Sequence, residues 1–266
     1  MLNQQNRSHF LTGDIESHVD SKVYDAILKT HAKEAIALID FGLASVTTAE
    51  NEVIERVQFT ECDISPFHKN DISCEASESV PFTRHSSINA FDPEPLAFEK
   101  LSTFLIHAFS PDTTGRRPYP SAGGLYPIEP LIFIFNERVK SENPITPGCY
   151  HFRPISKKLQ LIKKLSFDTF YSKMMHGLIK PENTPCFTIL YVAHVGKAIF
   201  KYRYRGYRHA VMEAGAMYQQ ATIASQSLGL RTTAWSSFGD HEILNAINLD
   251  PGVFLPVTMQ LFGYRA

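Results

Sequence analysis

The stretch YPSAGGLYPIEPLIFIFN, residues 119–136, joins a loop of small residues to a continuous apolar run. Gly123 and Gly124 have no side chains, so another group can approach the main chain of this loop closely. The run LIFIF has no polar interruption, which is typical of a strand that is covered on both faces. The sequence therefore predicts a shaped loop at one end of a buried strand.

This loop has two interpretations. Its exposed backbone N–H groups and the Ser121 hydroxyl would suit a flat heteroaromatic ring lying against the main chain. Its composition also fits an ordinary tight turn before a strand. A phosphate cradle of the Rossmann or Walker type is excluded, because the chain contains neither GxGxxG nor GxxxxGK(S/T).

Helices and strands are interleaved around this stretch without a regular βαβ repeat. Helical spacing predicts a helix that is capped by Asp92 and has prolines in its first turn. The predicted helices cover residues 92–109, 167–179, 209–229 and 239–250, and the predicted strands lie within residues 149–164 (a hairpin), 186–195 and 254–264. This order favours an α+β fold, with a mixed or antiparallel sheet flanked by helices.

The composition excludes several classes of protein. The chain has 266 residues, a formal net charge of −1, 44% hydrophobic residues and 20% charged residues. The lack of a basic excess argues against a general nucleic-acid binder. No apolar run approaches the roughly 20 residues that a membrane span needs, and the start, MLNQQNRSHFLTGD, has no secretory signal. We therefore expect a cytoplasmic protein.

A polar stretch, KNDISCEASES at residues 69–79, predicts a linker between two parts of the chain. We divide the chain into an N-terminal accessory segment, residues 1–78, and a main domain, residues 79–266. Apolar residues recur at helical spacing from Val23 to Ile39 and predict one amphipathic helix or two short ones, up to about Ala44. The accessory segment is too small to bury much core alone, so we expect it to pack on the main domain or to contact a partner.

The chain has four cysteines, Cys62, Cys74, Cys149 and Cys186. None forms a CxxC pair, and we expect free thiols. Cys62 and Cys74 could be combined with His68 and His85 into a zinc site, but this spacing is wide and irregular compared with structural zinc sites. We expect no metal site.

The octapeptide KYRYRGYR, which begins at Lys201, contains four cations and three tyrosines. In an extended chain Lys201 would share a face with Arg203 and Arg205, whereas in a helix it would group with Tyr204 and Arg208. Interleaved aromatic and cationic side chains also suit single-stranded nucleic acids. The nearly neutral chain has no second basic cluster, which weighs against that interpretation.

Residues at the end of the octapeptide and just after it have structural interpretations instead of catalytic ones. We expect Arg208 and Glu213 to form a buried ion pair that anchors the long helix, and Tyr207 to serve packing.

Three segments together resemble a known family. SAGGLYPIE follows RRPYP and precedes a buried strand, KYRYRGYRHAVMEAGAMYQQA joins the octapeptide to an alanine-rich helix, and NLD precedes a closing strand with FG. These segments are similar to the flavin-dependent dehydrogenases of the nitroreductase superfamily, in the microcin and streptolysin branch that oxidises azoline rings in peptides. The resemblance runs from about residue 80 to residue 264 and implies an FMN enzyme, with FMN at the interface of a homodimer.

The resemblance also implies a set of cofactor-binding residues. The Arg-rich phosphate stretch of the family corresponds to RHSSIN, residues 84–89, where one arginine remains and Arg265 or Arg231 would supply the missing charge. The loop would lie along one side of the flavin ring, and residues 233–237 would approach the other. The hydroxyl and amide groups here could instead be helix caps or turn residues. The implied residues are Arg84, Ser86, Ser87, Asn89, Pro120, Ser121, Ala122, Gly123, Gly124, Ala234, Trp235, Ser236 and Arg265.

Azoline oxidation removes a proton from the α-carbon of the ring and passes a hydride from the β-carbon to the flavin. By the same resemblance, the adjacent residues Lys201 and Tyr202 are the catalytic pair. An ordinary lysine is protonated at neutral pH, but nearby cations such as Arg203 and Arg205 favour its neutral form. These two arginines could also bind substrate carbonyls, the flavin or a partner.

The predicted function is FMN-dependent oxidation of peptide thiazolines or oxazolines to thiazoles or oxazoles, during maturation of a ribosomally made bacteriocin or antibiotic. The expected partners are the precursor peptide, a cyclodehydratase and a leader-peptide-binding subunit, with neither nucleic acid nor membrane. Two alternatives stay open: a general FMN nitroreductase with a nicotinamide donor, and a non-catalytic scaffold subunit. The Lys–Tyr pair argues against the former, because hydride exchange between flavin and nicotinamide needs no such base.

Overall fold

The computed structural model describes residues 17–33, 83–88, 90–173 and 184–266, together with residues 15, 57, 61, 72–74 and 175. The chain forms two compact units, one of Met1–Leu38 with Arg84–Ala266 and the other of Ile39–Thr83. The elements described below belong to the first unit. The predicted domain boundary near residue 78 stays a prediction.

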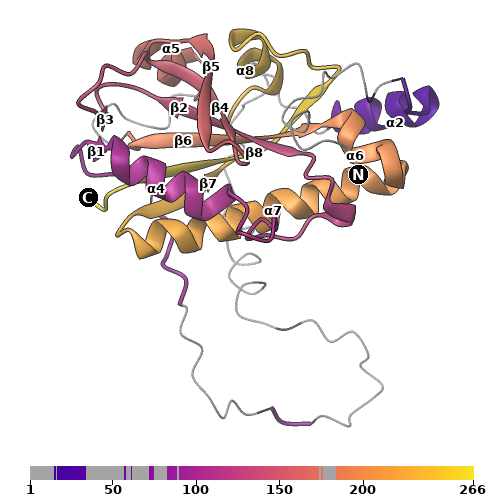
Figure 1. The fold of residues 1–266 in the computed structure, drawn as a ribbon, viewed down its shortest axis with the longest axis horizontal. Coiled ribbons are helices and arrows are strands. Elements are labelled where there is room, and N and C mark those ends of the chain that lie inside the picture. The colour runs from indigo at the N-terminus through magenta and orange to yellow at the C-terminus, as the bar shows by residue number, and fades with distance from the viewer. Residues whose placement is uncertain are drawn as a thin grey trace. The chain divides into compact units, whose positions relative to one another are not determined.

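A six-stranded antiparallel sheet forms the middle of the first unit, in the order β5-β4-β2-β6-β8-β7 (Figure 1). Its strands are β2 (Ile128–Ile134), β4 (Gly148–Arg153), β5 (Lys158–Lys164), β6 (Phe187–His194), β7 (Arg231–Trp235) and β8 (Phe254–Gly263). Two short strands, β1 (Leu96–Ala97) and β3 (Val139–Lys140), form a separate parallel pair. The predicted hairpin is confirmed as β4 and β5, and the two other predicted strands as β6 and β8.

Helices cover both faces of this sheet. One face carries α4 and α7, and the other carries α5 and α8 (Figure 1). The described helices are α2 (Ser21–His31), α4 (Phe98–Phe109), α5 (Phe167–Lys173), α6 (Val195–Tyr202), α7 (Tyr204–Ser227) and α8 (Asp240–Ala246). None of the described helices is long and apolar enough to cross a membrane. The predicted α+β fold, an antiparallel sheet flanked by helices, is confirmed.

Each face of the sheet has its own apolar core. Along β2, Ile132 and Ile134 point into the core that includes α4 and α7. Leu131 and Phe133 point into the core that includes α5 and α8. Successive side chains of a strand alternate between faces, so a strand with a core on both sides is apolar at successive positions. This explains the uninterrupted run LIFIF.

The predicted helix that starts at Asp92 is wrong at its first turn. Leu96 and Ala97 are extended because they pair with β3, and α4 begins only at Phe98. The Asp92 carboxylate instead accepts a hydrogen bond from the Glu94 N–H at 2.8 Å and closes a turn before the helix. Tertiary pairing therefore overrides the local helix signal.

Segments far apart in the sequence meet at one end of the sheet. The Pro127 carbonyl, just before β2, accepts a hydrogen bond from the His194 N–H at the end of β6, at 2.9 Å. The loop before β8 reaches the same end, where the Gly252 carbonyl accepts a hydrogen bond from the Tyr24 hydroxyl of α2 at 2.7 Å. This end of the sheet therefore joins the loop before β2, the start of α6 and the N-terminal helix.

Candidate active site

The glycine loop (residues 119–127) presents bare main chain. Ala122–Gly124 form a single 3-10 turn, in which Gly123 (φ 63°) and Gly124 (φ 67°) adopt the left-handed conformation that favours glycine. The Ser121 hydroxyl accepts a hydrogen bond from the Tyr126 N–H at 2.8 Å and closes the loop. A Cβ on Gly124 would meet nothing within 4 Å, so this part of the loop is open.

Gly123 lies directly against the Lys–Tyr pair, Lys201 and Tyr202. A Cβ on Gly123 would lie 2.8 Å from the Tyr202 hydroxyl oxygen and 3.3 Å from the Lys201 nitrogen. The Lys201 nitrogen is 5.4 Å from the centre of the Tyr202 ring. The structure thus brings the glycine loop and the Lys–Tyr pair together, and a side chain at position 123 would collide with the pair.

The cationic octapeptide is divided between two helices. α6 ends at Tyr202, Arg203 adopts φ 51° and ψ −131°, and α7 begins at Tyr204. The segment is therefore neither extended nor one continuous helix. The corner is tight because α7 packs closely on α6: a Cβ on Gly206 would lie 1.9 Å from the Ala198 carbonyl oxygen.

The N-terminal helix α2 contacts this corner at two points. The Arg203 guanidinium forms an exposed ion pair with Asp20, which also caps α2, with a separation of 2.7 Å. The Tyr207 hydroxyl lies 3.0 Å from the Nδ1 atom of His31. Helix α2 therefore packs on the main fold next to the Lys–Tyr pair. Packing on the main domain was one of two expectations for the accessory segment; the other, contact with a partner, stays a prediction.

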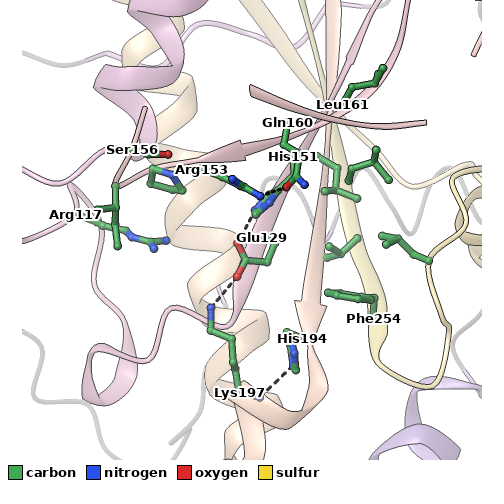
Figure 2. Close-up of a pocket in the computed structure, with 16 residues that line it drawn as sticks. Arg117, Glu129, His151, Arg153, Ser156, Gln160, Leu161, His194, Lys197 and Phe254 are labelled. Atoms are coloured by element: carbon green, nitrogen blue, oxygen red, sulfur yellow. Dashed lines mark hydrogen bonds and ion pairs between the residues drawn. The ribbon is translucent and has the colours of Figure 1, made fainter. Parts of the chain in front are cut away.

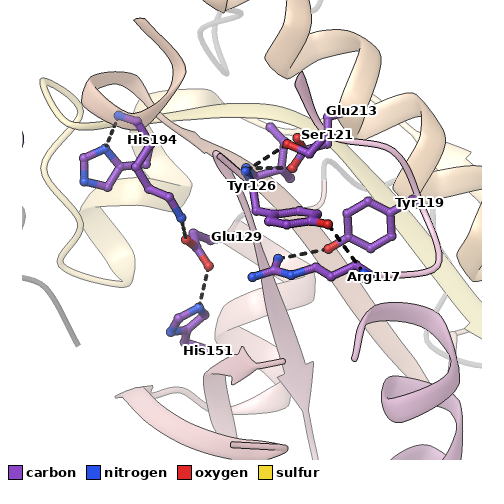
Figure 3. A network of polar contacts seen from close by, with 10 residues as sticks. Arg117, Tyr119, Ser121, Tyr126, Glu129, His151, His194 and Glu213 are labelled. Carbon is purple, nitrogen blue, oxygen red and sulfur yellow. Dashed lines mark hydrogen bonds and ion pairs between the residues drawn. The ribbon is translucent and has the colours of Figure 1, made fainter. Parts of the chain in front are cut away.

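Glu213 of α7 lies buried beneath the glycine loop. Its carboxylate accepts a hydrogen bond from the Ile128 N–H at 3.4 Å, at the start of β2 (Figure 3). Burial raises the pKa of Glu213 to about 7, although a hydrogen bond from Ser121 acts in the opposite direction. The predicted buried ion pair with Arg208 is wrong, because Arg208 is exposed.

A stacked group fixes the base of the glycine loop. The Arg117 guanidinium lies over the Tyr126 ring, 4.1 Å from its centre, and donates a hydrogen bond to the Tyr119 hydroxyl at 3.1 Å. Figure 3 shows Arg117 running alongside the Tyr126 ring. The conformation of the loop is thus set by side chains on both of its flanks.

A charged triad lies on the other side of β2. Glu129 accepts hydrogen bonds from the Lys197 ammonium at 2.7 Å and from the His151 ring at 2.9 Å (Figure 2). Burial alone would raise the pKa of Glu129, but Lys197 and His151 hold it at about 2. The neighbouring His194 caps α6 by accepting from the Lys197 N–H at 3.3 Å, and its burial lowers its pKa to about 4. Glu129 is thus ionised and His194 neutral near pH 7.

The triad lines a cavity of about 630 Å³ on the face of the sheet that carries α5 and α8. Its floor includes Leu131 and Val192, and Phe254 closes one side. Arg117 and Arg153 also line it, and Figure 2 shows both side chains near Glu129. A volume of this size is typical of pockets for small molecules or short peptide segments.

The residues that the resemblance implies for the flavin phosphate lie elsewhere. Arg84, Ser86 and Ser87 are exposed, and the adjacent His85 N–H donates to the Gln226 side chain in the last turn of α7 at 3.1 Å. The Lys–Tyr pair precedes the first turn of α7. Because α7 has 24 residues, these two groups lie at opposite ends of a helix about 36 Å long.

The other implied cofactor-binding residues fall into three places. Arg265 follows β8 at the end of the sheet opposite to His194, and is exposed. Residues 234–236 lie at the end of the edge strand β7. Pro120 is exposed in the glycine loop, and Asn89 lies outside the described residues. One protomer therefore does not gather all of the implied residues in one place.

Within the described ranges, no three His, Cys, Asp or Glu side chains gather in a way that could hold a metal ion. Cys62 and His68 lie outside those ranges. Cys74, Cys149 and Cys186 are free thiols, as predicted.

The sequence patterns did not predict the charged triad or the position of Arg117. A signal for Glu129 was present, because it is the one charged residue in the apolar strand IEPLIFI. Buried charges need partners, so this residue predicts a cation nearby, although the sequence does not say which one.

Comparison with known proteins agrees with this fold. The model of the Nitroreductase family matches residues 83–264. The chain therefore belongs to the nitroreductase family, which supports a flavin-using oxidoreductase, and the predicted family and enzyme class are confirmed.

Two comparisons point to one branch of this family. The chain is 35% identical over 192 residues to the microcin B17-processing protein McbC of Escherichia coli, which covers 70% of each chain. It also matches a chain in the solved E. coli microcin synthetase McbBCD complex with truncated pro-MccB17 bound. That match has a TM-score of 0.86 and 28% identity and covers 98% of this chain and 100% of that chain. The predicted resemblance to the microcin type is confirmed.

A third comparison concerns the fold alone. A putative nitroreductase from Ralstonia eutropha shares it with a TM-score of 0.57 and 19% identity, over 73% of this chain and 88% of that chain.

Proposed function

We propose that this protein is an FMN-dependent azoline dehydrogenase, which oxidises thiazolines and oxazolines in a ribosomally made peptide to thiazoles and oxazoles. The observation that carries the proposal is the contact of Gly123 with Lys201 and Tyr202. It places two groups capable of proton transfer beside main chain that is open to a flat ring. The similarity to the microcin B17-processing protein supports this reaction class.

The chemistry divides between cofactor and protein. When bound, FMN would accept the hydride that leaves the β-carbon of the azoline ring. The protein must accept the proton that leaves the α-carbon. The Tyr202 oxygen and the Lys201 nitrogen both lie within 3.3 Å of one point beside Gly123. A ring held at that point therefore has two groups capable of proton transfer in reach.

The residues present fit FMN. The main chain at Gly123 and Gly124 is exposed, and a Cβ on Gly124 would point into open space, so a flat ring can lie against the loop. At the other end of α7, the exposed side chains of Arg84, Ser86 and Arg265 offer the guanidinium and hydroxyl donors that bind phosphate well. Residues 234–236 would approach the flavin ring.

A homodimer would complete this site. The residues proposed to bind the phosphate, Arg84, Ser86 and Arg265, lie towards one end of the 24-residue helix α7, and the Lys–Tyr pair lies at the other. FMN is much shorter than this helix, so a single protomer cannot use both groups on one molecule of FMN. In an isologous dimer, each end of α7 in one protomer can lie beside the other end in its partner. We therefore place each FMN between two protomers.

We further propose that the enzyme acts in the cytoplasm within a complex that contains a cyclodehydratase and a leader-peptide-binding subunit. The match to a chain of the McbBCD complex supports such an assembly. The accessory segment, residues 1–78, is the candidate contact with these partners.

The test is to purify the protein with its partners, record a visible spectrum and identify the flavin released by heat. We expect FMN, and loss of two hydrogens per ring when a thiazoline peptide is supplied. A protein that stays colourless after incubation with FMN and removal of the unbound flavin would contradict the proposal. Rapid bleaching by NADH without azole formation would instead support a general nitroreductase.

A further inference from the structure

The cavity lies close to the Lys–Tyr pair along α6. Lys197 lines the cavity and precedes Lys201 by four residues on α6. Residues spaced by four lie on the same side of a helix, roughly 6 Å apart along its axis. Arg117, at the base of the loop, also lines the cavity, whereas Gly123, at its tip, contacts Tyr202. The cavity is therefore one helical turn away from the proposed proton-transfer groups.

The negative charge of Glu129, at the polar end of the cavity, is compensated. Lys197 and His151 both contact the ionised carboxylate of Glu129, at 2.7 and 2.9 Å. Arg117 and Arg153 also line the cavity, so its lining carries more cationic side chains than carboxylates. The cavity therefore suits a ligand that carries hydrogen-bond acceptors.

Two arginines line the same cavity and can supply donors. Arg117 covers the Tyr126 ring with one face of its guanidinium, 4.1 Å from the ring centre. Arg153 contacts the exposed side chain of Gln160 on the neighbouring strand. A guanidinium presents several N–H donors and also stacks on flat rings. Such residues bind a planar ligand that has carbonyl groups.

The cavity lining also includes exposed apolar side chains. Ile155 and Leu161, from the β4–β5 hairpin, line it and are 68% and 36% exposed. The floor beneath them is formed in part by Leu131 and Val192. Exposed large apolar side chains in the lining of a cavity mark a binding surface. The ligand therefore combines an apolar ring with polar carbonyls.

We propose that this cavity binds an azole ring already formed in the same peptide, with its flanking carbonyls on Arg117 and Arg153. This inference rests on the proposed function. An extended peptide spans about 3.3–3.6 Å per residue, so an azole two or three residues from the reacting ring reaches from the Lys–Tyr pair into the cavity. Each finished ring then helps to hold the peptide for the next oxidation.

Direct binding is the first test. A short peptide amide with one thiazole and no azoline is titrated calorimetrically into the FMN-loaded complex. We expect binding that Arg153→Ala weakens about tenfold, the loss of roughly one charged hydrogen bond. Arg117→Leu should weaken it as well. The matched control is Arg116→Ala, which removes an exposed neighbour that does not line the cavity. Equal affinity of Arg153→Ala and the native complex would overturn the inference.

Kinetics separate this inference from the proposed function. Two thiazoline peptides are compared, one with and one without a thiazole two residues away. We expect the native enzyme to have the lower KM for the thiazole-bearing peptide, and Arg153→Ala to lose this difference. Arg116→Ala, which lies outside the cavity, should keep it. Equal KM values in the native enzyme overturn the inference and leave the proposed function intact. If neither peptide is oxidised, the proposed function falls and the inference falls with it.

Discussion

At the scale of single residues, the Tyr202 hydroxyl and the Lys201 nitrogen share one small space beside Gly123. We predict that Tyr202→Phe and Lys201→Ala retain bound flavin but form azoles about 10²–10⁴-fold more slowly, the usual contribution of a general base. The Tyr202 ring packs edge-on against His209 at 4.8 Å, and phenylalanine preserves that contact. Flavin content is measured by absorbance, and azole formation by mass spectrometry.

The matched control for these variants is Tyr204→Phe. Tyr204 begins α7 and is 55% exposed, so loss of its hydroxyl should change neither flavin content nor rate. If Tyr202→Phe lost flavin in proportion to activity, Tyr202 would be a cofactor-binding residue instead of a catalytic one.

Glu213 makes the free energy of unfolding depend on pH. This dependence can be separated from the effects of the other titrating groups. Burial raises its pKa from 4.5 in the unfolded chain to about 7 in the folded protein. Below about pH 4.5 the carboxyl is protonated in both states. Between these values the unfolded chain ionises first, so the free energy of unfolding falls as pH rises. The shift corresponds to at most roughly 3 kcal/mol above pH 7.

We predict that Glu213→Gln removes this fall in the free energy of unfolding at higher pH. Glutamine can still accept the hydrogen bond from the Ile128 N–H. Denaturant unfolding of both proteins at pH 4.5, 6 and 8 should show a stability difference in favour of the variant that grows with pH. Glu129 and His194 titrate in both proteins, so their effects cancel in the difference. A difference that stays constant from pH 4.5 to 8 would contradict the raised pKa.

At the scale of secondary structure, the α6–α7 corner depends on Gly206. A Cβ there would lie 1.9 Å from the Ala198 carbonyl oxygen and 2.8 Å from the Ile199 Cα, both main-chain atoms that cannot rotate away. We predict that Gly206→Ala forces the helices apart and lowers the free energy of unfolding by about 1–3 kcal/mol. Because α6 carries the Lys–Tyr pair, azole formation should fall as well. Thermal unfolding and rate measurements check both effects.

The control for this substitution lies on the same helix. A Cβ on Gly215 would meet nothing within 4 Å. Gly215→Ala should therefore stabilise α7 by about 0.5–1 kcal/mol through helix propensity. Similar destabilisation by both substitutions would show that Gly206 has no special packing role.

The α6–α7 corner shows which features local sequence patterns do not predict. The run LIFIF and the alternating hairpin were predicted because their patterns are local and periodic. The break at Arg203 was not predicted, because it arises where Gly206 meets α6, a contact that no local pattern encodes. The start of α4 was misplaced for the same reason, since Leu96 and Ala97 are held extended by β3.

The candidate site also has parts that could be predicted from the sequence and parts that could not. The glycine loop and the Lys–Tyr pair were predicted as parts of one site from their composition and family resemblance, and the structure places them in contact. The partners of Glu129 come from β4 and α6, so only the register of the sheet and the position of α6 bring them together.

At the scale of the whole molecule, the implied cofactor-binding residues form two groups that lie near opposite ends of α7. The glycine loop and the Lys–Tyr pair lie near its first turn, and residues 84–87 and Arg265 lie towards the other end. An exposed apolar strip on α7 includes Val211, Met212 and Ile223, which are 42%, 66% and 38% exposed. Apolar side chains gathered on one helix face favour association, so this strip is the natural contact in the proposed homodimer.

A shared site predicts that two defective subunits rescue each other. One subunit carries Arg84→Ala with Arg265→Ala, and the other carries Tyr202→Phe; each forms inactive homodimers. In a hybrid dimer, one of the two sites combines the intact phosphate side of the second subunit with the intact Tyr202 of the first. Random pairing makes half of the dimers hybrid, so co-expression should restore about one quarter of native activity, with flavin in one site per hybrid. A hybrid isolated with two affinity tags that remains inactive would show that each site lies within one protomer.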